Sequence, residues 1–106
     1  MFKNQQTIQA EIDRIKRELL IIGSMRPGSL SRQPRARGGE YYQLSYSHRG
    51  KGHTEYVRSE YEPEIRKEIE AYRKFRELTR RWVELALELA KLKQKKAAET
   101  SSGSGG

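Results

Sequence analysis

The fold is decided by residues 26–61, RPGSLSRQPRARGGEYYQLSYSHRGKGHTEYVRSEY, a basic and tyrosine-rich stretch between two segments of helical pattern. Within it, 41–47 (YYQLSYS) and 53–58 (HTEYVR) contain the aromatic and β-branched residues that favour strands. The glycine-bearing link 48–52 has a length that a hairpin can use. We therefore predict a β-hairpin over these residues.

The predicted hairpin has two different faces, because side chains alternate along a strand. Tyr42, Leu44 and Tyr46 fall on one face, which we expect to cover a helix. Tyr56 is also expected in the core, since buried aromatic rings supply packing area. Tyr41 lies on the opposite face and is the better candidate for stacking on a base. A two-stranded hairpin is marginal in water, so it must dock on a helix or gain a strand from a partner.

An N-terminal helix is predicted over 1–22. Its apolar residues recur at alternating spacings of four and three, which places them on one helical face. Gly23 followed by Pro27 supplies a stop. The stripe needs an apolar partner, and it consists of Ile8, Ile12, Ile15, Leu19 and Ile22.

A long C-terminal helix is predicted over 62–96, with Pro63 in its first turn. Its apolar residues form two sets on different faces. The first set, Ile65, Ile69 and Tyr72, is assigned to the hairpin. The second has coiled-coil-like spacing and is assigned to the first helix or to a second copy of the chain. This helix-pairing set comprises Phe75, Leu78, Trp82, Leu85, Leu89 and Leu92.

Length and composition indicate one small domain with a thin core. The chain has 106 residues, of which 34% are hydrophobic, and a net charge of +8. The expected class is α+β and mostly helical: an N-terminal helix (1–22), a basic loop and β-hairpin (23–61) and a long C-terminal helix (62–96). The tail 97–106, which ends in the linker-like SSGSGG, is expected to be disordered.

The positive charge is concentrated in the central segment and in the last turns of the long helix. Residues 23–58 contain seven basic and two acidic groups, and 91–96 contain four lysines. Guanidinium groups can bind phosphate oxygens two at a time. A solvated linker is an equally good interpretation of the arginine-rich segment 23–39, which is expected to be a loop. The candidate nucleic-acid-binding residues are Arg32, Arg35, Arg37, Tyr41, His48, Arg49, Lys51 and Arg58.

Basic residues also recur every seven positions along the long helix, as at Arg66, Arg73 and Arg80. They could track phosphates, but Glu70 with Lys74 and Glu77 with Arg81 have the spacing of ion pairs along one helix. A solvated face is the favoured interpretation.

Several classes of function are disfavoured. Without cysteine the chain has no disulfide or thiolate metal site, and we predict no metal site and no cofactor. It lacks an apolar leader and an apolar run that would span a bilayer, so we expect a cytoplasmic protein without membrane contact. We do not expect an enzyme, because His48 and His53 border a turn, where histidines are usually solvated, and acid–base catalysis needs tuned groups in a cleft.

Four ordered motifs resemble a family of small prokaryotic proteins of unassigned function that are encountered around transposases and other mobile elements: PGSLSRQ (27–33), YYQLSYSHRGK (41–51), TEYV (54–57) and EIRKEIEAYRKFREL (64–78). The resemblance spans about residues 26–92. Many members have a cysteine cluster between the first two motifs, whereas 31–39 here reads SRQPRARGG, so a metal site is not carried over. The resemblance implies an arginine loop, a tyrosine hairpin and a long helix in a genomic setting consistent with DNA.

The sequence thus favours a nucleic-acid-binding protein, with duplex DNA preferred over RNA, that uses phosphate contacts and serves as an accessory to a mobile-element enzyme. The alternative is an adaptor whose helices pair with another copy or with a helical protein partner. A helical dimer that presents two basic hairpins would satisfy both hypotheses.

Overall fold

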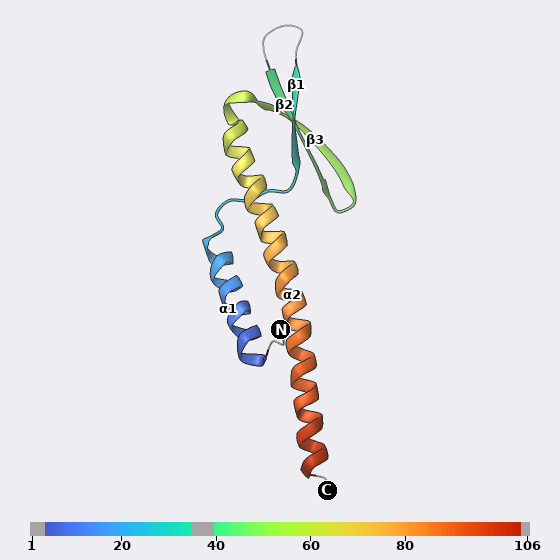
Figure 1. The fold of residues 1–106 in the computed structure, drawn as a ribbon. Helices are drawn as coiled ribbons and strands as arrows, with labels where there is room; N and C mark the ends of the chain where they lie inside the picture. The colour runs from blue at the N-terminus through green and yellow to red at the C-terminus, as the bar shows by residue number, and fades with distance from the viewer. Residues whose placement is uncertain (1–3, 35–39, 105–106) are drawn as a thin grey trace. The chain divides into compact units, whose positions relative to one another are not determined.

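The computed structural model describes residues 4–34 and 40–104 (Figure 1). It confirms the α+β class, with an N-terminal helix, an antiparallel sheet and a long C-terminal helix. The chain divides into a helical unit, residues 1–21 and 76–106, and a sheet unit, residues 22–75. In chain order the elements are α1 (Gln5–Ile21), β1 (Ser29–Pro34), β2 (Glu40–His48), β3 (Lys51–Arg58), a 3-10 turn (Ser59–Tyr61) and α2 (Glu62–Ser104).

The helical unit is held together by one apolar seam between α1 and the C-terminal part of α2, which run in opposite directions (Figure 1). Asn4 caps α1, because its Oδ1 accepts a hydrogen bond from the Thr7 backbone N–H at 2.8 Å. Three isoleucines of the predicted stripe, Ile8, Ile12 and Ile15, are buried in the seam. Ile22 lies beyond α1, in the sheet unit.

The helix-pairing residues of α2 are mostly used within the chain itself. Leu85 and Leu89 are buried against α1, and Phe75 instead lies in the sheet unit with its ring centroid 6.4 Å from that of Tyr72. The sequence leaves open whether this set packs on the first helix or on a second copy of the chain. In the structure it packs on the first helix, α1. The remaining three, which pack at the margin of the same seam, are Leu78, Trp82 and Leu92.

The sheet has three strands in the order β1-β2-β3, so β2 is central. The prediction of a loop over the whole of 23–39 is wrong for Ser29–Pro34, which pairs antiparallel with β2 from Ser29 opposite Ser45 to Pro34 opposite Glu40. Pro34 is tolerated because it ends an edge strand. Arg32 consequently lies on a strand, and the chain itself supplies the third strand that the hairpin needs.

The turn between β2 and β3 is tighter than predicted. Only Arg49 and Gly50 form it, with φ of 52° and 78°, and positive φ at both residues is the requirement of a type I′ hairpin turn. Lys51 and Gly52, expected in a five-residue link, belong to β3 and pair with His48 and Ser47.

One face of the sheet packs on α2. Leu44 and Val57 are buried with Ile65 and Ile69 of α2, and Tyr42 and Tyr46 pack at the margin, which confirms the predicted core face of β2. The prediction for Tyr56 is wrong, since its side chain is 72% exposed. The reason is register: Val57 lies opposite Tyr42 on the core face, so the preceding residue must face the other way.

The segment that leads into β1 passes close to the sheet and to α2. The Arg26 backbone N–H donates to the Glu68 carbonyl oxygen of α2 at 3.1 Å. Gly28 has φ of +138°, and a Cβ at this position would lie 2.8 Å from Leu44 Cδ1. A Cβ here would therefore force the Leu44 side chain to shift, and the positive φ would strain any residue other than glycine.

Helix α2 continues to Ser104, eight residues past the predicted end at Lys96. The disorder predicted for the tail is therefore not what the structure shows for 97–104. Ala97, Ala98 and Glu99 are good helix formers, which accounts for the first part of this extension. Neither α1 nor α2, over the described residues, combines the length and the apolar character needed to cross a membrane.

Candidate nucleic-acid interface

The sheet presents a polar face on the side opposite α2, which we call the outer face. Its described side chains carry hydroxyl, amide and phenol groups together with one guanidinium, and none of them is a carboxylate. Glu55, the acidic residue of β3, lies on the core side, where its carboxylate accepts from the Tyr46 hydroxyl at 3.3 Å and pairs with Arg26 at 3.6 Å. The outer face is formed by Ser29, Ser31, Gln33, Tyr41, Gln43, Ser45, Ser47, Thr54, Tyr56 and Arg58.

Two tyrosines form the aromatic part of the outer face. The ring centroids of Tyr41 and Tyr56 are 5.3 Å apart with the rings inclined at 66°, an edge-to-face contact. Tyr41 is half-buried, whereas Tyr56 is exposed. Tyr41, the predicted stacking residue, thus supports a second ring that offers more surface to a ligand.

Hydrogen bonds tie down part of the polar face. Gln33 Nε2 donates to Ser31 Oγ at 3.2 Å, and this Oγ donates to the backbone carbonyl of Gln43 at 3.5 Å. These bonds join the side chains of the edge strand β1 to the central strand. They were not foreseen, because β1 was not predicted as a strand.

The structure separates the predicted binding residues into two groups at opposite ends of the sheet. His48, Arg49 and Lys51 surround the hairpin turn, whereas Arg32, Tyr41 and Arg58 lie at the other end. Seven residues along β2 separate Tyr41 from His48, which corresponds to about 24 Å. In the strand register Arg32 lies opposite Tyr42, and Arg58 lies opposite Tyr41. Because Tyr41 and Tyr42 are on different faces of the sheet, so are the two arginines. Arg35 and Arg37 lie outside the described residues.

The positive charges at the turn end of the sheet are not neutralised by nearby described carboxylates. Neither Arg49 nor Lys51 takes part in an ion pair within 4–34 and 40–104, and both are exposed. At the other end, Arg58 Nη1 lies 3.8 Å from Glu60 Oε1, and both side chains are largely exposed. Such a pair in water is worth little, so it leaves Arg58 available to a stronger anion.

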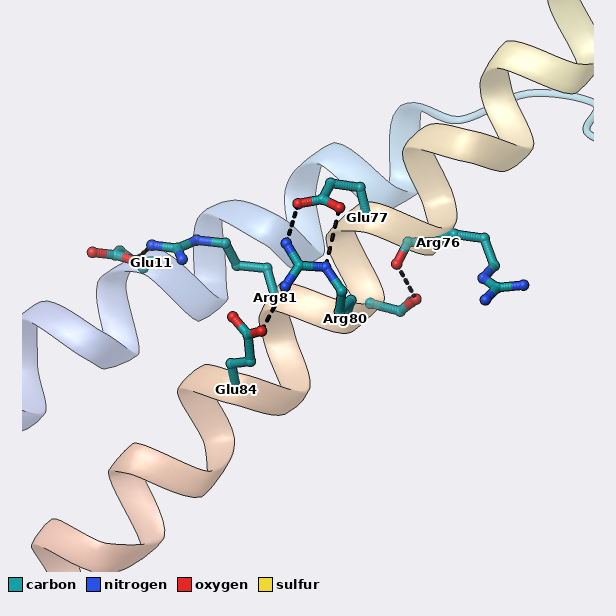
Figure 2. Close-up of polar contacts among 7 residues, drawn as sticks. Glu11, Arg76, Glu77, Arg80, Arg81 and Glu84 are labelled. Carbon is teal, nitrogen blue, oxygen red and sulfur yellow. Dashed lines mark hydrogen bonds and ion pairs between the residues drawn. The ribbon is translucent and has the colours of Figure 1, made fainter.

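Several arginines of α2 form ion pairs with carboxylates of the protein. Arg80 donates to Glu77 and to Glu84, and Arg81 Nη2 lies 3.2 Å from Glu11 Oε2 of α1 (Figure 2). The hydrogen bond from Arg80 lowers the pKa of Glu77 and raises the pKa of Arg80 itself.

Arg66 and Arg73 are likewise paired within α2, with Glu62 and Glu70. Glu70 and Glu77 pair with the arginines three residues on, instead of with the Lys74 and Arg81 that the sequence suggested. These pairs favour the solvated-face interpretation of the helix over phosphate tracking.

A groove of about 370 Å³ lies elsewhere, between α1 and α2 of the helical unit. Ile15 and Leu78 form its apolar part, and charged residues of both signs, including Glu18 and Arg14, line the rest. It contains none of the predicted nucleic-acid-binding residues. In the part of the chain that the structure describes, no cluster of three or more histidine and carboxylate side chains could hold a metal ion.

Comparisons with known proteins add no relative: no protein-family model, curated protein or solved structure matches this chain.

Proposed function

We propose that this protein binds nucleic acid, with duplex DNA preferred over RNA, through phosphate contacts made from the two ends of its sheet. The observation that carries the proposal is the placement of cations at both ends of a sheet whose outer face includes no carboxylate among its described side chains. Phosphate contacts fix the position of a protein on a duplex and release counterions, which is the main source of affinity in such complexes.

Two further features support this proposal. The chain has a net charge of +8, which attracts a polyanion over long range. The resemblance to a prokaryotic family found around mobile elements is consistent with DNA as the ligand and with a role as accessory to a mobile-element enzyme.

The proposal is tested by binding to labelled duplex DNA, single-stranded DNA and RNA across a salt series. We expect tightest binding to the duplex, with affinity that falls steeply with salt. The slope of log K against log salt is about −0.9 per phosphate contacted. Absence of binding to all three ligands at low salt would reject the proposal.

A double variant of the hairpin turn, Arg49→Asn with Lys51→Gln, tests the location of the contacts. Asparagine tolerates positive φ, so the turn is preserved while two charges are lost. We expect the magnitude of the salt slope to fall by about 0.9 for each phosphate contact removed. The control is Lys74→Gln, an exposed residue of α2 in the same unit, which should leave the slope unchanged. Equal effects of the two variants would place the contacts elsewhere.

A second candidate function, helical self-association or adaptor binding, is favoured by exposed apolar side chains on α2. Val83 and Leu87 are 58% and 59% exposed. Each is two residues from the buried Leu85, so both lie on the side of the helix away from α1. Light scattering of the wild type and of Val83→Glu with Leu87→Glu tests this function. If the protein self-associates, its measured mass exceeds the 12.4 kDa of one chain, and the double variant has a lower mass than the wild type. A wild-type mass equal to that of one chain at every concentration would contradict self-association.

A further inference from the structure

We infer that the outer face of the sheet reads base sequence in the major groove of duplex DNA, and that Gln43 is the residue that recognises an adenine. This inference rests on the DNA binding proposed above. It goes beyond it, because phosphate contacts hold a protein on DNA without reading sequence.

The dimensions of the sheet select the groove. Three strands are separated by two spacings of about 4.8 Å, so the sheet is about 10 Å across its backbone. The major groove of B-form DNA is about 12 Å wide, whereas the minor groove is about 6 Å wide. The major groove of A-form RNA is deep and narrow and excludes such an element. The width of the outer face therefore favours the major groove of DNA over the DNA minor groove and over the major groove of RNA.

The charges at the two ends of the sheet suit the same placement. With the strands along the groove, the row that holds Arg58 and the turn that holds Arg49 are about 24 Å apart along its length. Arg58, on the outer face, and Arg49, at the turn, can therefore reach phosphates at two separate points along the groove, while the uncharged middle of the face lies over the base edges. Phosphate contacts of this kind fix register and orientation.

Gln43 occupies the middle of this face. It lies on the central strand, with Ser31 opposite it on β1 and Tyr56 opposite it on β3. Its side chain is half-buried, and among the described residues its amide has no hydrogen-bond partner, unlike the Gln33 amide, which donates to Ser31. A glutamine amide can donate to N7 of adenine and accept from its N6 amino group at the same time. This two-point contact distinguishes adenine from the other bases in the major groove.

The exposed ring of Tyr56 borders this amide on β3. Its edge-to-face contact with Tyr41 fixes its orientation, which preserves an aromatic wall beside Gln43.

Selection from a randomised pool of duplex DNA tests the inference with the full-length protein. The wild type is expected to enrich sequences that share an adenine, and Gln43→Ala is expected to lose the preference at that position alone, by about ten- to a hundredfold. Affinity for unselected DNA should stay within a few fold of the wild type. Gln94→Ala, which removes the same amide from an exposed position of α2, is the matched control and should keep the preference.

Replacement of the selected adenine by 7-deazaadenine tests the chemistry of the contact, since it removes the N7 acceptor alone. The wild type should bind this duplex more weakly, whereas Gln43→Ala should not distinguish the two duplexes. Duplex binding without any sequence preference, or a preference that survives Gln43→Ala, would overturn the inference and leave the proposed function standing. Absence of duplex binding by the wild type would overturn both.

Discussion

Single residues constrain the backbone of the sheet unit at Gly28 and at Arg49. Both have positive φ, of +138° and 52°, a conformation that residues with a Cβ rarely adopt. Gly28 also has no room for a side chain, because Leu44 and the Ser45 carbonyl lie within 3.1 Å of where a Cβ would be. The glycine of the PGSL motif thus has a packing role in the sheet.

Gly28→Ala is expected to lower the free energy of unfolding by about 2 kcal/mol or more, from unfavourable φ together with overpacking against Leu44. Denaturant unfolding monitored by circular dichroism measures this change. Gly23→Ala is the control, because no atom lies within 4 Å of the added Cβ and its φ lies outside the positive range. Similar unfolding midpoints for the two variants would contradict the close approach at Gly28.

At the hairpin turn, Arg49→Asn is expected to leave stability unchanged or slightly higher, whereas Arg49→Val should reduce it by about 1 kcal/mol. The reason is that asparagine adopts positive φ far more readily than a β-branched residue. The midpoints of thermal unfolding of the two variants can be compared directly, because both substitutions remove the same positive charge. If valine were tolerated as well as asparagine, the two-residue turn with positive φ would be wrong.

At the scale of elements, the predictable parts are those with a regular apolar period. The seam isoleucines of α1 and the core face of β2 follow from spacing alone. Strand β1 could not be predicted in this way, since Ser29–Pro34 contains a single apolar residue, Leu30, and a proline. It becomes a strand because β2 offers unpaired backbone groups, a tertiary effect that overrides local preference.

The candidate site was predictable only in part for the same reason. Alternation along β2 already placed Tyr41 and Gln43 on one face. The side chains that surround Gln43 come from β1 and from the register of β3, and a shift of one residue in that register exchanges Tyr56 and Val57 between faces. The basic candidates could be chosen from the sequence, but their separation into two groups at opposite ends of the sheet follows only from the strand register.

Within α2, the ion pair of Glu77 predicts a pH dependence. The hydrogen bond from Arg80 lowers the pKa of Glu77 below its ordinary value of 4.5. A carboxyl whose pKa is lowered by folding adds stability above its unfolded pKa, and this stability is lost as pH falls through the lower, folded-state pKa. A carbon NMR titration of the Glu77 carboxyl should show the low pKa in the wild type and a return toward 4.5 in Arg80→Gln.

Arg73→Gln is the matched control for this titration, because Arg73 pairs with Glu70 one heptad earlier. It should leave the pKa of Glu77 unchanged. A Glu77 titration insensitive to Arg80→Gln would show that Arg80 is not its partner in solution.

At the scale of the whole molecule, the described residues form two apolar cores that share no buried residue. Leu44 and Leu85 are almost completely buried, one in each core. Each leucine-to-alanine substitution should cost about 2–5 kcal/mol of the stability of its own core.

Amide hydrogen exchange should therefore respond locally to these two substitutions. Leu44→Ala is expected to raise exchange in β2 and β3 more than in α1, and Leu85→Ala is expected to do the reverse. Equal increases throughout both units would contradict the separation of the cores.

The order of the two units along the chain has a genetic consequence. Residues 22–75, which hold every described strand and the sheet core, form one uninterrupted stretch, whereas the helical unit is assembled from two separate stretches, 1–21 and 76–106. A single coding segment can therefore transfer the sheet unit to a protein with a different pair of supporting helices. Exchange of the helical unit, by contrast, needs two coordinated replacements that preserve the match between α1 and the seam of α2.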